Sequence, residues 1–388
     1  MVRPPVSSLA PPEGPYRSGM ATAERAEVLD TRALNRALLA RQLLLERSPL
    51  DVPAALEHVV GLQAQAPQTP YPALWSRLDR FDPATLSNLI AERAVVRVVL
   101  MRGTIHAVTA RDALRIRPAV QPVLDAALGG RTGRELDGID HEDLREATLA
   151  LLDDGPVSYA ALGTGLAARW PDRDPDELRR AGRVLVPLVQ VPPRGLWRTA
   201  GPAVHVSLAA WLGRPLDPDA GVDELVVRYL RAFGPASVAD IANWSGLTGL
   251  PAVVERLGPR LRRFADPAGR TLHDVTDGLL PDAGTSAPPR FLPDFDNLWL
   301  AHADRTRIVP EQYRARLIKK NASGCPVFLL DGFVAGTWRL ERRRRVTTLV
   351  IGPFEPLTAS DRDALADEGG RLVAFLAPDA TTTELRFA

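Results

Sequence analysis

One pattern occurs three times along this chain: two or three helices followed by a short β-hairpin. In each copy, apolar residues recur first at helical spacing and then in two strand-like runs joined by a turn. The copies predict three winged-helix units, at residues 29–135, 136–215 and 216–280. Residues 1–28 are rich in Pro, Gly and Ser and predict a flexible tail. The repeat restricts the fold to an assembly of small helix-and-hairpin modules.

Local capping and turn signals support these units. The pair Asp82–Pro83 is typical of a helix N-cap followed by the first helical position. A hairpin is predicted over residues 95–108, at the end of the helices of the first unit. In the third unit, residues 237–257 predict a helix-turn-helix with Gly246 at its turn. The first helix is expected to begin near Thr31.

Each predicted hairpin carries one histidine in its return strand: His106, His205 and His273. A histidine in a strand is more often a packed residue than a metal ligand. We interpret the three histidines as a consequence of the repeated fold.

The chain changes character after the third unit, and residues 281–388 predict a β-rich domain that carries one helix. Residues 288–302 have the composition of strands and tight turns. Asp331–Gly332 is a strong hairpin signal. The late helix has Thr358 or Ser360 as its cap. The fold class is therefore α+β, mostly helical.

Composition excludes some classes of protein. No apolar run approaches the ~20 residues that span a bilayer, and the N-terminus lacks the apolar core of a signal peptide. We expect a cytoplasmic, nucleoid-associated protein with no membrane partner. The net charge of +1 gives no general attraction to nucleic acid, so DNA binding needs a local basic patch. Cys325 is the one cysteine, and its surroundings predict a buried, inert thiol.

Standard enzyme signatures are absent: the sequence has no GxGxxG, Walker loop, GxSxG or HExxH motif. Asp294 and Asp296 would share a face of a strand and could bind a metal ion. No third ligand stands at suitable spacing, so we favour a turn in which these carboxylates bond to the local backbone. The sequence thus predicts neither a cofactor nor a metal.

The strongest basic cluster comprises Arg342, Arg343, Arg344 and Arg345, within a predicted β-hairpin. On a strand, Arg342 and Arg344 would point to one side, and the other two to the opposite side. Such a hairpin could bind DNA phosphates, or it could be a solvated strand edge protected by charge. Beside three predicted winged helices, we favour DNA contact.

Gln63 and Gln65 lie in an irregular, proline-rich stretch between two predicted helices. In extended backbone the two side chains point to the same side, whereas in a helix they would diverge. Without other information, these are structural loop residues.

The segments GLQAQAPQTPYPALWSRL, MRGTIHAV, FLPDFDNLWLAHADRTRIV and DGFVAGTWR together resemble the winged-helix interstrand-crosslink DNA glycosylases, the AlkZ and YcaQ proteins. The resemblance extends from about Leu34 to the C-terminus. It implies three tandem winged helices around a concave DNA channel, a monomer, and double-stranded DNA carrying alkylated purines as the partner. It also identifies Gln63 and Gln65 as the catalytic residues, in the arrangement of the AlkZ branch.

The resemblance implies hydrolysis of the N-glycosidic bond of N7-alkylguanine, including bulky adducts and crosslinks, in DNA repair or in self-resistance to DNA-alkylating natural products. Glutamine has no useful pKa, so the two amides would orient a water molecule and direct a dipole at the cationic sugar. Glu57 is a further candidate carboxylate near the motif. Two alternatives stay open: a non-enzymatic winged-helix regulator, and a protein that sequesters the alkylating compound.

Overall fold

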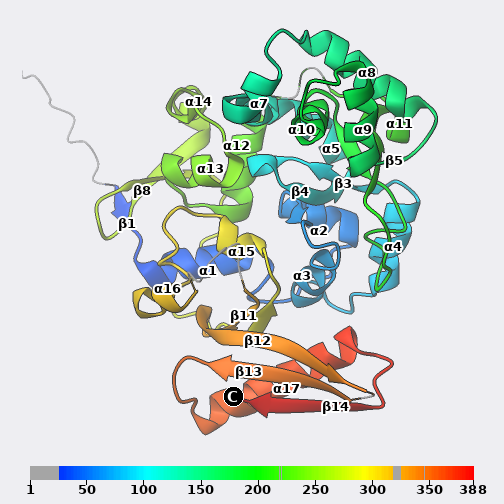
Figure 1. Cartoon of the computed structure of the whole chain (residues 1–388). Helices are drawn as coiled ribbons and strands as arrows, with labels where there is room; N and C mark the ends of the chain where they lie inside the picture. The colour runs from blue at the N-terminus through cyan, green and yellow to red at the C-terminus, as the bar shows by residue number, and fades with distance from the viewer. Residues whose placement is uncertain (1–25, 218, 220, 318–324, 345) are drawn as a thin grey trace, which may run out of the picture.

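The computed structural model describes residues 26–217, 219, 221–317, 325–344 and 346–388, and these form an α+β fold that is mainly helical (Figure 1). Most of the predicted tail lies outside the described residues. Its last part differs from the prediction, because β1 (Glu27–Val28) pairs in parallel with a strand of the third unit. Helix α1 (Thr31–Arg41) begins where the sequence predicted, with Asp30 as its N-cap.

The first unit combines short helices with an antiparallel hairpin. Its elements are α2 (Val52–His58), β2 (Leu62–Gln63), α3 (Pro70–Arg77), α4 (Pro83–Ala91), β3 (Val95–Val99) and β4 (Ile105–Thr109). The helices α5 (Ala110–Ala119), α6 (Gln121–Asp125) and α7 (Gly130–Glu135) follow. Asp82 accepts a hydrogen bond from the Ala84 N–H and thereby caps α4, which confirms the predicted cap.

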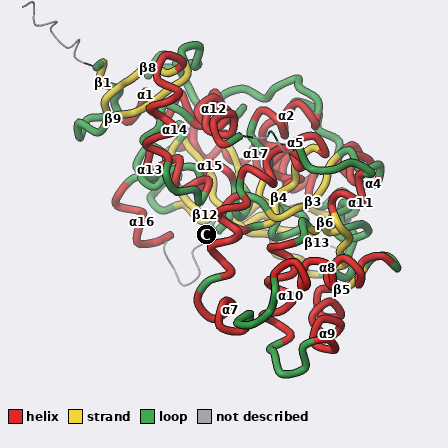
Figure 2. Tube along the Cα trace, turned by 90° about the horizontal axis from the view of Figure 1, so that it is seen from above, coloured by secondary structure: helices red, strands yellow, loops and turns green. Residues whose placement is uncertain are grey.

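The second unit continues the sheet of the first. Its elements are α8 (His141–Asp153), β5 (Val157–Ser158), α9 (Tyr159–Arg169), α10 (Pro175–Leu185), β6 (Leu188–Gln190), β7 (Val204–Ser207) and α11 (Leu208–Leu212). Strands β3 and β6 pair through Arg97–Gln190 and Val98–Val189, so the two hairpins form one six-stranded sheet in the order β2-β4-β3-β6-β7-β5. Figures 1 and 2 both show α7, α8, α9 and α10 grouped at one side of the molecule.

The third unit contains the predicted helix-turn-helix. Its elements are α12 (Val222–Phe233), α13 (Val238–Ser245), α14 (Leu250–Leu257), β8 (Leu261–Ala265) and β9 (Thr271–Val275). Ser237 and Asp240 form a capping box at the start of α13. Gly246 ends α13 with a φ of 82°, a left-handed conformation that suits glycine.

The C-terminal part forms a five-stranded sheet covered by one long helix. Its elements are β10 (Arg290–Leu292), α15 (Asn297–Leu300), α16 (Glu311–Leu317), β11 (Val327–Leu330), β12 (Phe333–Arg343), β13 (Val346–Pro353), α17 (Ala359–Leu376) and β14 (Thr382–Phe387). The sheet order is β10-β11-β12-β13-β14, and Thr358 caps α17.

Two sequence predictions for this region are wrong. Residues 288–302 were expected to form strands, but only Arg290–Leu292 do so, because Asp296 caps helix α15 through the Leu298 N–H at 2.9 Å. Cys325 was expected to be buried, but it is exposed and lies before β11 rather than within it.

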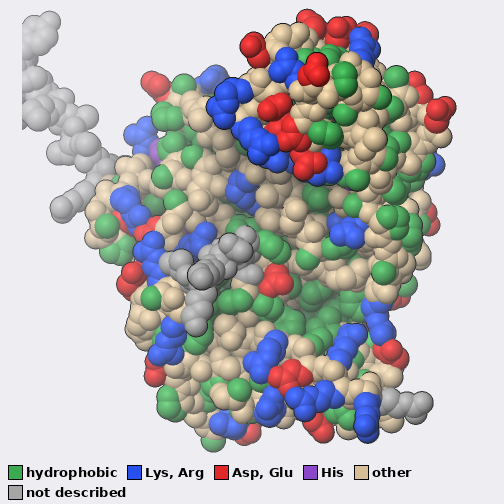
Figure 3. Space-filling view, in the orientation of Figure 1, with side chains coloured by type: hydrophobic (Ala, Val, Ile, Leu, Met, Phe, Trp, Pro, Cys, Tyr) green, Lys and Arg blue, Asp and Glu red, His purple; other side chains and the backbone are tan. Residues whose placement is uncertain are grey.

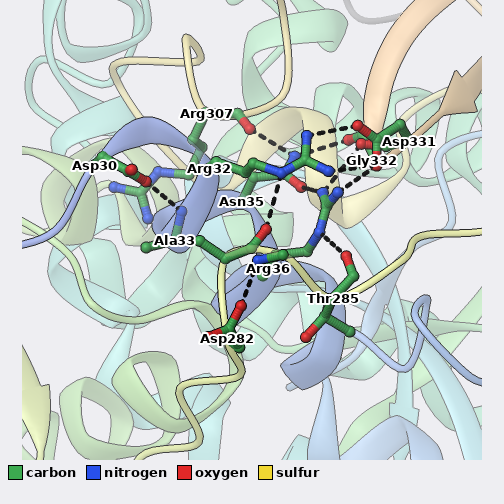
Figure 4. A network of polar contacts seen from close by, with 12 residues as sticks. Asp30, Arg32, Ala33, Asn35, Arg36, Asp282, Thr285, Arg307, Asp331 and Gly332 are labelled. Atoms are coloured by element: carbon green, nitrogen blue, oxygen red, sulfur yellow. Dashed lines mark hydrogen bonds and ion pairs between the residues drawn. The ribbon is translucent and has the colours of Figure 1, made fainter.

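Helix α1 connects the N-terminal and C-terminal parts, and Figure 4 shows its contacts with the β11–β12 turn. Asp331 and Gly332 form this turn, as predicted, both with positive φ. The Asp331 carboxylate accepts hydrogen bonds from Arg32 and Arg36 of α1. The Asn35 amide donates to the Gly332 carbonyl at 2.8 Å. The largest apolar core likewise combines residues from α1, α12 and α15, so these segments pack as one body.

Candidate active site around Gln63 and Gln65

Gln63 ends β2, an edge strand added to the first hairpin, and Ala64 and Gln65 follow directly after it. Gln63 pairs with His106 on β4, and the Ala64 N–H donates to the Ile105 carbonyl at 2.7 Å. The motif is thus non-helical, with Gln63 in the strand and Gln65 in the bend that follows it. Gln63 is buried, whereas Gln65 is exposed. The motif therefore starts inside the protein and ends at its surface.

Gly61 allows the chain to turn from α2 into this strand. Its φ is 82°, in the left-handed region that favours glycine. A Cβ atom at this position would lie 2.4 Å from Val108 Cγ1, which is far too close. Gly61 is therefore required both by its conformation and by its close contact with β4.

The Gln63 amide is held by an arginine from the hairpin turn. Arg102 Nη2 donates to Gln63 Oε1 at 2.9 Å, and Arg102 Nη1 donates to the Trp244 carbonyl on α13. Burial lowers the pKa of the Arg102 guanidinium to about 10, so it stays charged at neutral pH. A cation thus fixes the orientation of the Gln63 carbonyl.

His106, the cross-strand neighbour of Gln63, is a neutral imidazole. Burial, together with the charge of Arg102, lowers its pKa to about 3. Its Nδ1 lies 2.9 Å from the Thr104 carbonyl, which can only accept, so Nδ1 carries the proton. His106 therefore adds no charge to the site at neutral pH.

Gln65 is held more loosely. Its Oε1 accepts a hydrogen bond from the Ile105 N–H at 3.3 Å. Because an amide oxygen has two lone pairs, Gln63 and Gln65 each keep one lone pair. Neither amide nitrogen donates a hydrogen bond to another residue in the described part of the chain. Both side chains thus retain donor and acceptor capacity for a substrate.

A second arginine of the hairpin holds the backbone of the motif. Arg97 on β3 is fully buried and donates from Nη2 to the Ala64 carbonyl at 2.9 Å. Burial, together with the nearby charge of Arg194, lowers the pKa of Arg97 to about 10. The peptide between the two glutamines is therefore fixed by a buried cation.

The Asp296–Asn297 pair holds the motif from both ends. Asn297 Nδ2 donates to the carbonyls of Gly61 at 2.7 Å and Val59 at 3.2 Å. Asp296 accepts two hydrogen bonds from Arg77 of α3, each 2.8 Å long. The residues before the motif and the helix after it are thus both attached to the start of α15.

These contacts give a structural role to Asp296, one of the two aspartates that the sequence analysis considered as a metal pair. Asp296 uses its carboxylate for Arg77 and for the cap of α15. Burial raises the pKa of the Asp294 carboxyl. Among the residues described, no group of three or more His, Cys, Asp or Glu could hold a metal ion.

The remaining candidate residues near the hairpins are Glu57 and the histidines of the second and third hairpins. Glu57 accepts hydrogen bonds from Thr109 Oγ1 at 3.0 Å and from Arg111 at 2.6 Å, so its carboxylate is occupied. His205 and His273 lie on β7 and β9 as predicted. Burial is the largest cause of the shift in both histidines. It lowers the pKa of His205 to about 4 and lowers the pKa of His273 below its ordinary value.

The arginine cluster lies in a different sheet from the glutamines. Arg342 and Arg343 end β12 opposite Thr347 and Val346. Arg344 has a φ of 55° and forms the turn, so the predicted alternation of Arg342 and Arg344 on one strand is wrong. Arg345 lies outside the described residues. The described members of the cluster are exposed, and none of them forms a hydrogen bond with Gln63 or Gln65.

One face of the molecule is hollowed. Figure 3 shows a recessed, largely apolar middle, with basic side chains, all of them arginines, above it and below it. The lower basic side chains overlie the β12–β13 region that Figure 1 places beneath the rest of the molecule.

No described helix is long and apolar enough to cross a membrane.

Sequence reasoning missed Arg97, Arg102 and Asn297. Arg97 interrupts the otherwise apolar run VVRVV, and a buried arginine in such a strand is a usable signal. Arg102 precedes the turn glycine, and Asn297 follows the aspartates discussed above. Nothing local indicates that all three contact the glutamine segment or the residues beside it.

Comparison with known proteins identifies the class. The profile of the AlkZ-like DNA glycosylase family matches residues 56–375, so the chain belongs to that family and is an enzyme of the DNA glycosylase class.

An interstrand DNA cross-link repair glycosylase from Streptomyces sahachiroi is 24% identical over 359 residues, which cover 84% of this chain and 92% of that protein. The solved structure of the Streptomyces sahachiroi DNA glycosylase AlkZ has a similar fold. Its TM-score is 0.76 at 20% identity, and the match covers 93% of this chain and 99% of that one.

Proposed function

We propose that this protein is a monofunctional DNA glycosylase that hydrolyses the N-glycosidic bond of N7-alkylguanine in double-stranded DNA, with Gln63 and Gln65 as its catalytic residues. The observation that carries the proposal is the pair of hydrogen-bonded amides, one buried and one exposed, at the end of an edge strand in a chain of the AlkZ-like family. The related glycosylase is named for cross-link repair, so interstrand crosslinks and bulky monoadducts are the expected substrates. Repair and self-resistance to DNA-alkylating natural products are the proposed roles.

The chemistry of the substrate explains why amides suffice. Alkylation at N7 makes guanine cationic, so the base leaves readily while the sugar gains oxocarbenium character. The free lone pairs of Gln63 and Gln65 can hold the attacking water and place negative dipole density near the sugar. Neither amide changes protonation near neutral pH, so neither acts as an ordinary general base. Neutral bases, which leave less readily, are expected to react slowly.

The binding surface is proposed to be a concave channel for one duplex. Winged-helix units at residues 29–135, 136–215 and 216–280 would surround it, and the domain of residues 281–388 would close one side. The hollowed, basic-rimmed face supports this arrangement (Figure 3). Arg342 and its neighbours in the β12–β13 hairpin would contact phosphates, since they are exposed and cationic. A monomer would be sufficient for such a channel.

The test is release of base from two duplexes, one with N7-methylguanine and one with a bulky N7-guanine adduct. The wild-type protein is compared with Gln63→Ala, Gln65→Ala and the control Gln312→Ala, which removes an exposed glutamine on α16. Release that is lost in the first two variants, while duplex binding persists, supports the proposal.

Tight duplex binding without release from either substrate would contradict the proposal and favour a DNA-binding regulator. Affinity for the alkylating compound in the absence of DNA, again without base release, would favour sequestration.

A further inference from the structure

Arg102 occupies an unusual place in the first hairpin. It lies in the turn between β3 and β4 with a φ of 56°, a left-handed conformation that non-glycine residues seldom adopt. Gly103 follows it, and it too has positive φ. Unlike Arg80 and Arg344, which are also left-handed but exposed, Arg102 has its guanidinium held by two hydrogen bonds inside the protein.

Those contacts join two parts of the molecule. One guanidinium nitrogen donates to Gln63 Oε1 at 2.9 Å, and another donates to the Trp244 carbonyl near the end of α13. The turn also lies in van der Waals range of the end of α13, because a Cβ atom on Gly246 would lie 3.5 Å from the Arg102 N and Cα atoms. Arg102 therefore connects the first hairpin to the helix-turn-helix of the third unit.

The guanidinium forms no ion pair with a carboxylate among the residues described, so its hydrogen-bond partners are an amide and a peptide carbonyl. A charged donor makes a stronger hydrogen bond than a neutral one. Because Gln63 Oε1 faces Arg102, the amide cannot rotate freely. Its Nε2 group and the second lone pair of Oε1 therefore point in fixed directions for hydrogen bonding to a substrate or water.

We propose that Arg102 is a positioning residue for Gln63, which it orients by bridging the amide to the helix-turn-helix at Trp244. This inference rests on the proposed function, because the orientation of Gln63 matters only if Gln63 takes part in base excision. Arg102 acts through Gln63 and has no direct role in the chemistry. The orientation of Gln63 then depends on the relative position of the first and third units.

The test uses Arg102→Met, which keeps the aliphatic stem, and Arg102→Lys, which keeps one charged donor. Arg80→Met is the matched control, since Arg80 is also left-handed, with a φ of 51°, and its side chain is 91% exposed. Single-turnover base release is measured over a range of enzyme concentrations, together with thermal unfolding.

Arg102→Met is expected to lower the rate constant at saturation by roughly 10- to 100-fold, as for a misplaced catalytic group. The half-saturating concentration should change by less than about threefold, and Arg102→Lys should restore part of the rate. In a Gln63→Ala background, Arg102→Met should cause no further loss, because Arg102 acts through Gln63.

Other outcomes overturn the proposal. An unchanged rate constant with weaker, less salt-dependent binding would make Arg102 a phosphate contact. An equal loss in the Gln63→Ala background would show that Arg102 does not act through that residue.

A second measurement does not depend on activity. The Gln63 side-chain NH₂ signals are identified in ¹H–¹⁵N spectra as those missing from Gln63→Ala. Arg102→Met should shift or broaden them, whereas Arg80→Met should not, and unchanged signals in Arg102→Met would refute the bridge. If the wild type releases no base from any substrate, the proposed function fails, while these signals still decide whether Arg102 orients Gln63.

Discussion

Replacing Asp296 by asparagine is expected to destabilise the protein strongly, because the Arg77 guanidinium would keep its charge without its partner. The Arg77 side chain is fully buried and the Asp296 side chain is 2% exposed. Two hydrogen bonds of 2.8 Å join them. Removing one charge of such a buried pair costs about 3–5 kcal/mol. Asparagine can still accept one hydrogen bond, so we expect a loss of about 3 kcal/mol in the free energy of unfolding.

Urea unfolding followed by circular dichroism measures this loss. The matched control is Glu142→Gln, which breaks an ion pair with Arg145 whose side chains are 60% and 40% exposed. An exposed pair of this kind contributes little to stability, because water and salt screen its charges. Adding Arg77→Met to Asp296→Asn should recover part of the loss, because the uncompensated charge is gone. If Asp296→Asn costs no more than Glu142→Gln, the pair does not hold α3 against α15 as described.

Three further predictions concern single residues. Arg342→Ser should weaken duplex binding and reduce the salt slope by about one, with base release at saturation unchanged; an unaltered slope in a binding titration would exclude a phosphate contact. The pKa of His106 is lowered from 6.5 to about 3 in the folded protein. Between pH 6.5 and pH 3 the unfolded state therefore binds a proton that the folded state does not, and the free energy of unfolding falls as the pH drops through this range. His106→Gln should flatten the fall in urea midpoint between pH 7 and pH 5, and an equal fall would contradict a buried neutral imidazole. Gly61→Ala should lower stability by about 1–3 kcal/mol, through backbone strain and a contact with Val108, and should slow base release; calorimetry showing no change would rule out the strain.

Much of the local structure could be predicted because its causes lie within a few residues. Asp82 is followed by a proline at a helix start, Gly246 ends a helix, and Asp331–Gly332 form a two-residue turn. Each signal acts through the conformation of its own backbone, so tertiary contacts are not needed to interpret it. The helix Asn297–Leu300 was missed because its few residues are apolar and aromatic, which also suits a strand.

The site was predicted less completely because its contacts join distant residues. Gln63 and Gln65 were proposed from their resemblance to a known family, and the non-helical backbone between them followed from the prolines nearby. Asn297, by contrast, binds the carbonyl of Gly61 across 236 residues of chain. The pairing of β3 with β6 likewise depends on how two hairpins meet. No period or motif in a single sequence encodes such contacts.

The most direct test of the account is to identify the products formed from one duplex that carries a single N7-methylguanine. Excess wild-type protein is compared with the Gln63→Ala/Gln65→Ala double variant, and both base and strand are analysed by mass spectrometry. The account predicts free N7-methylguanine and an unbroken strand with one abasic site from the wild type, and unchanged DNA from the variant at equal binding. Equal base release by both proteins would contradict it, because the chemistry would then lie outside the two glutamines.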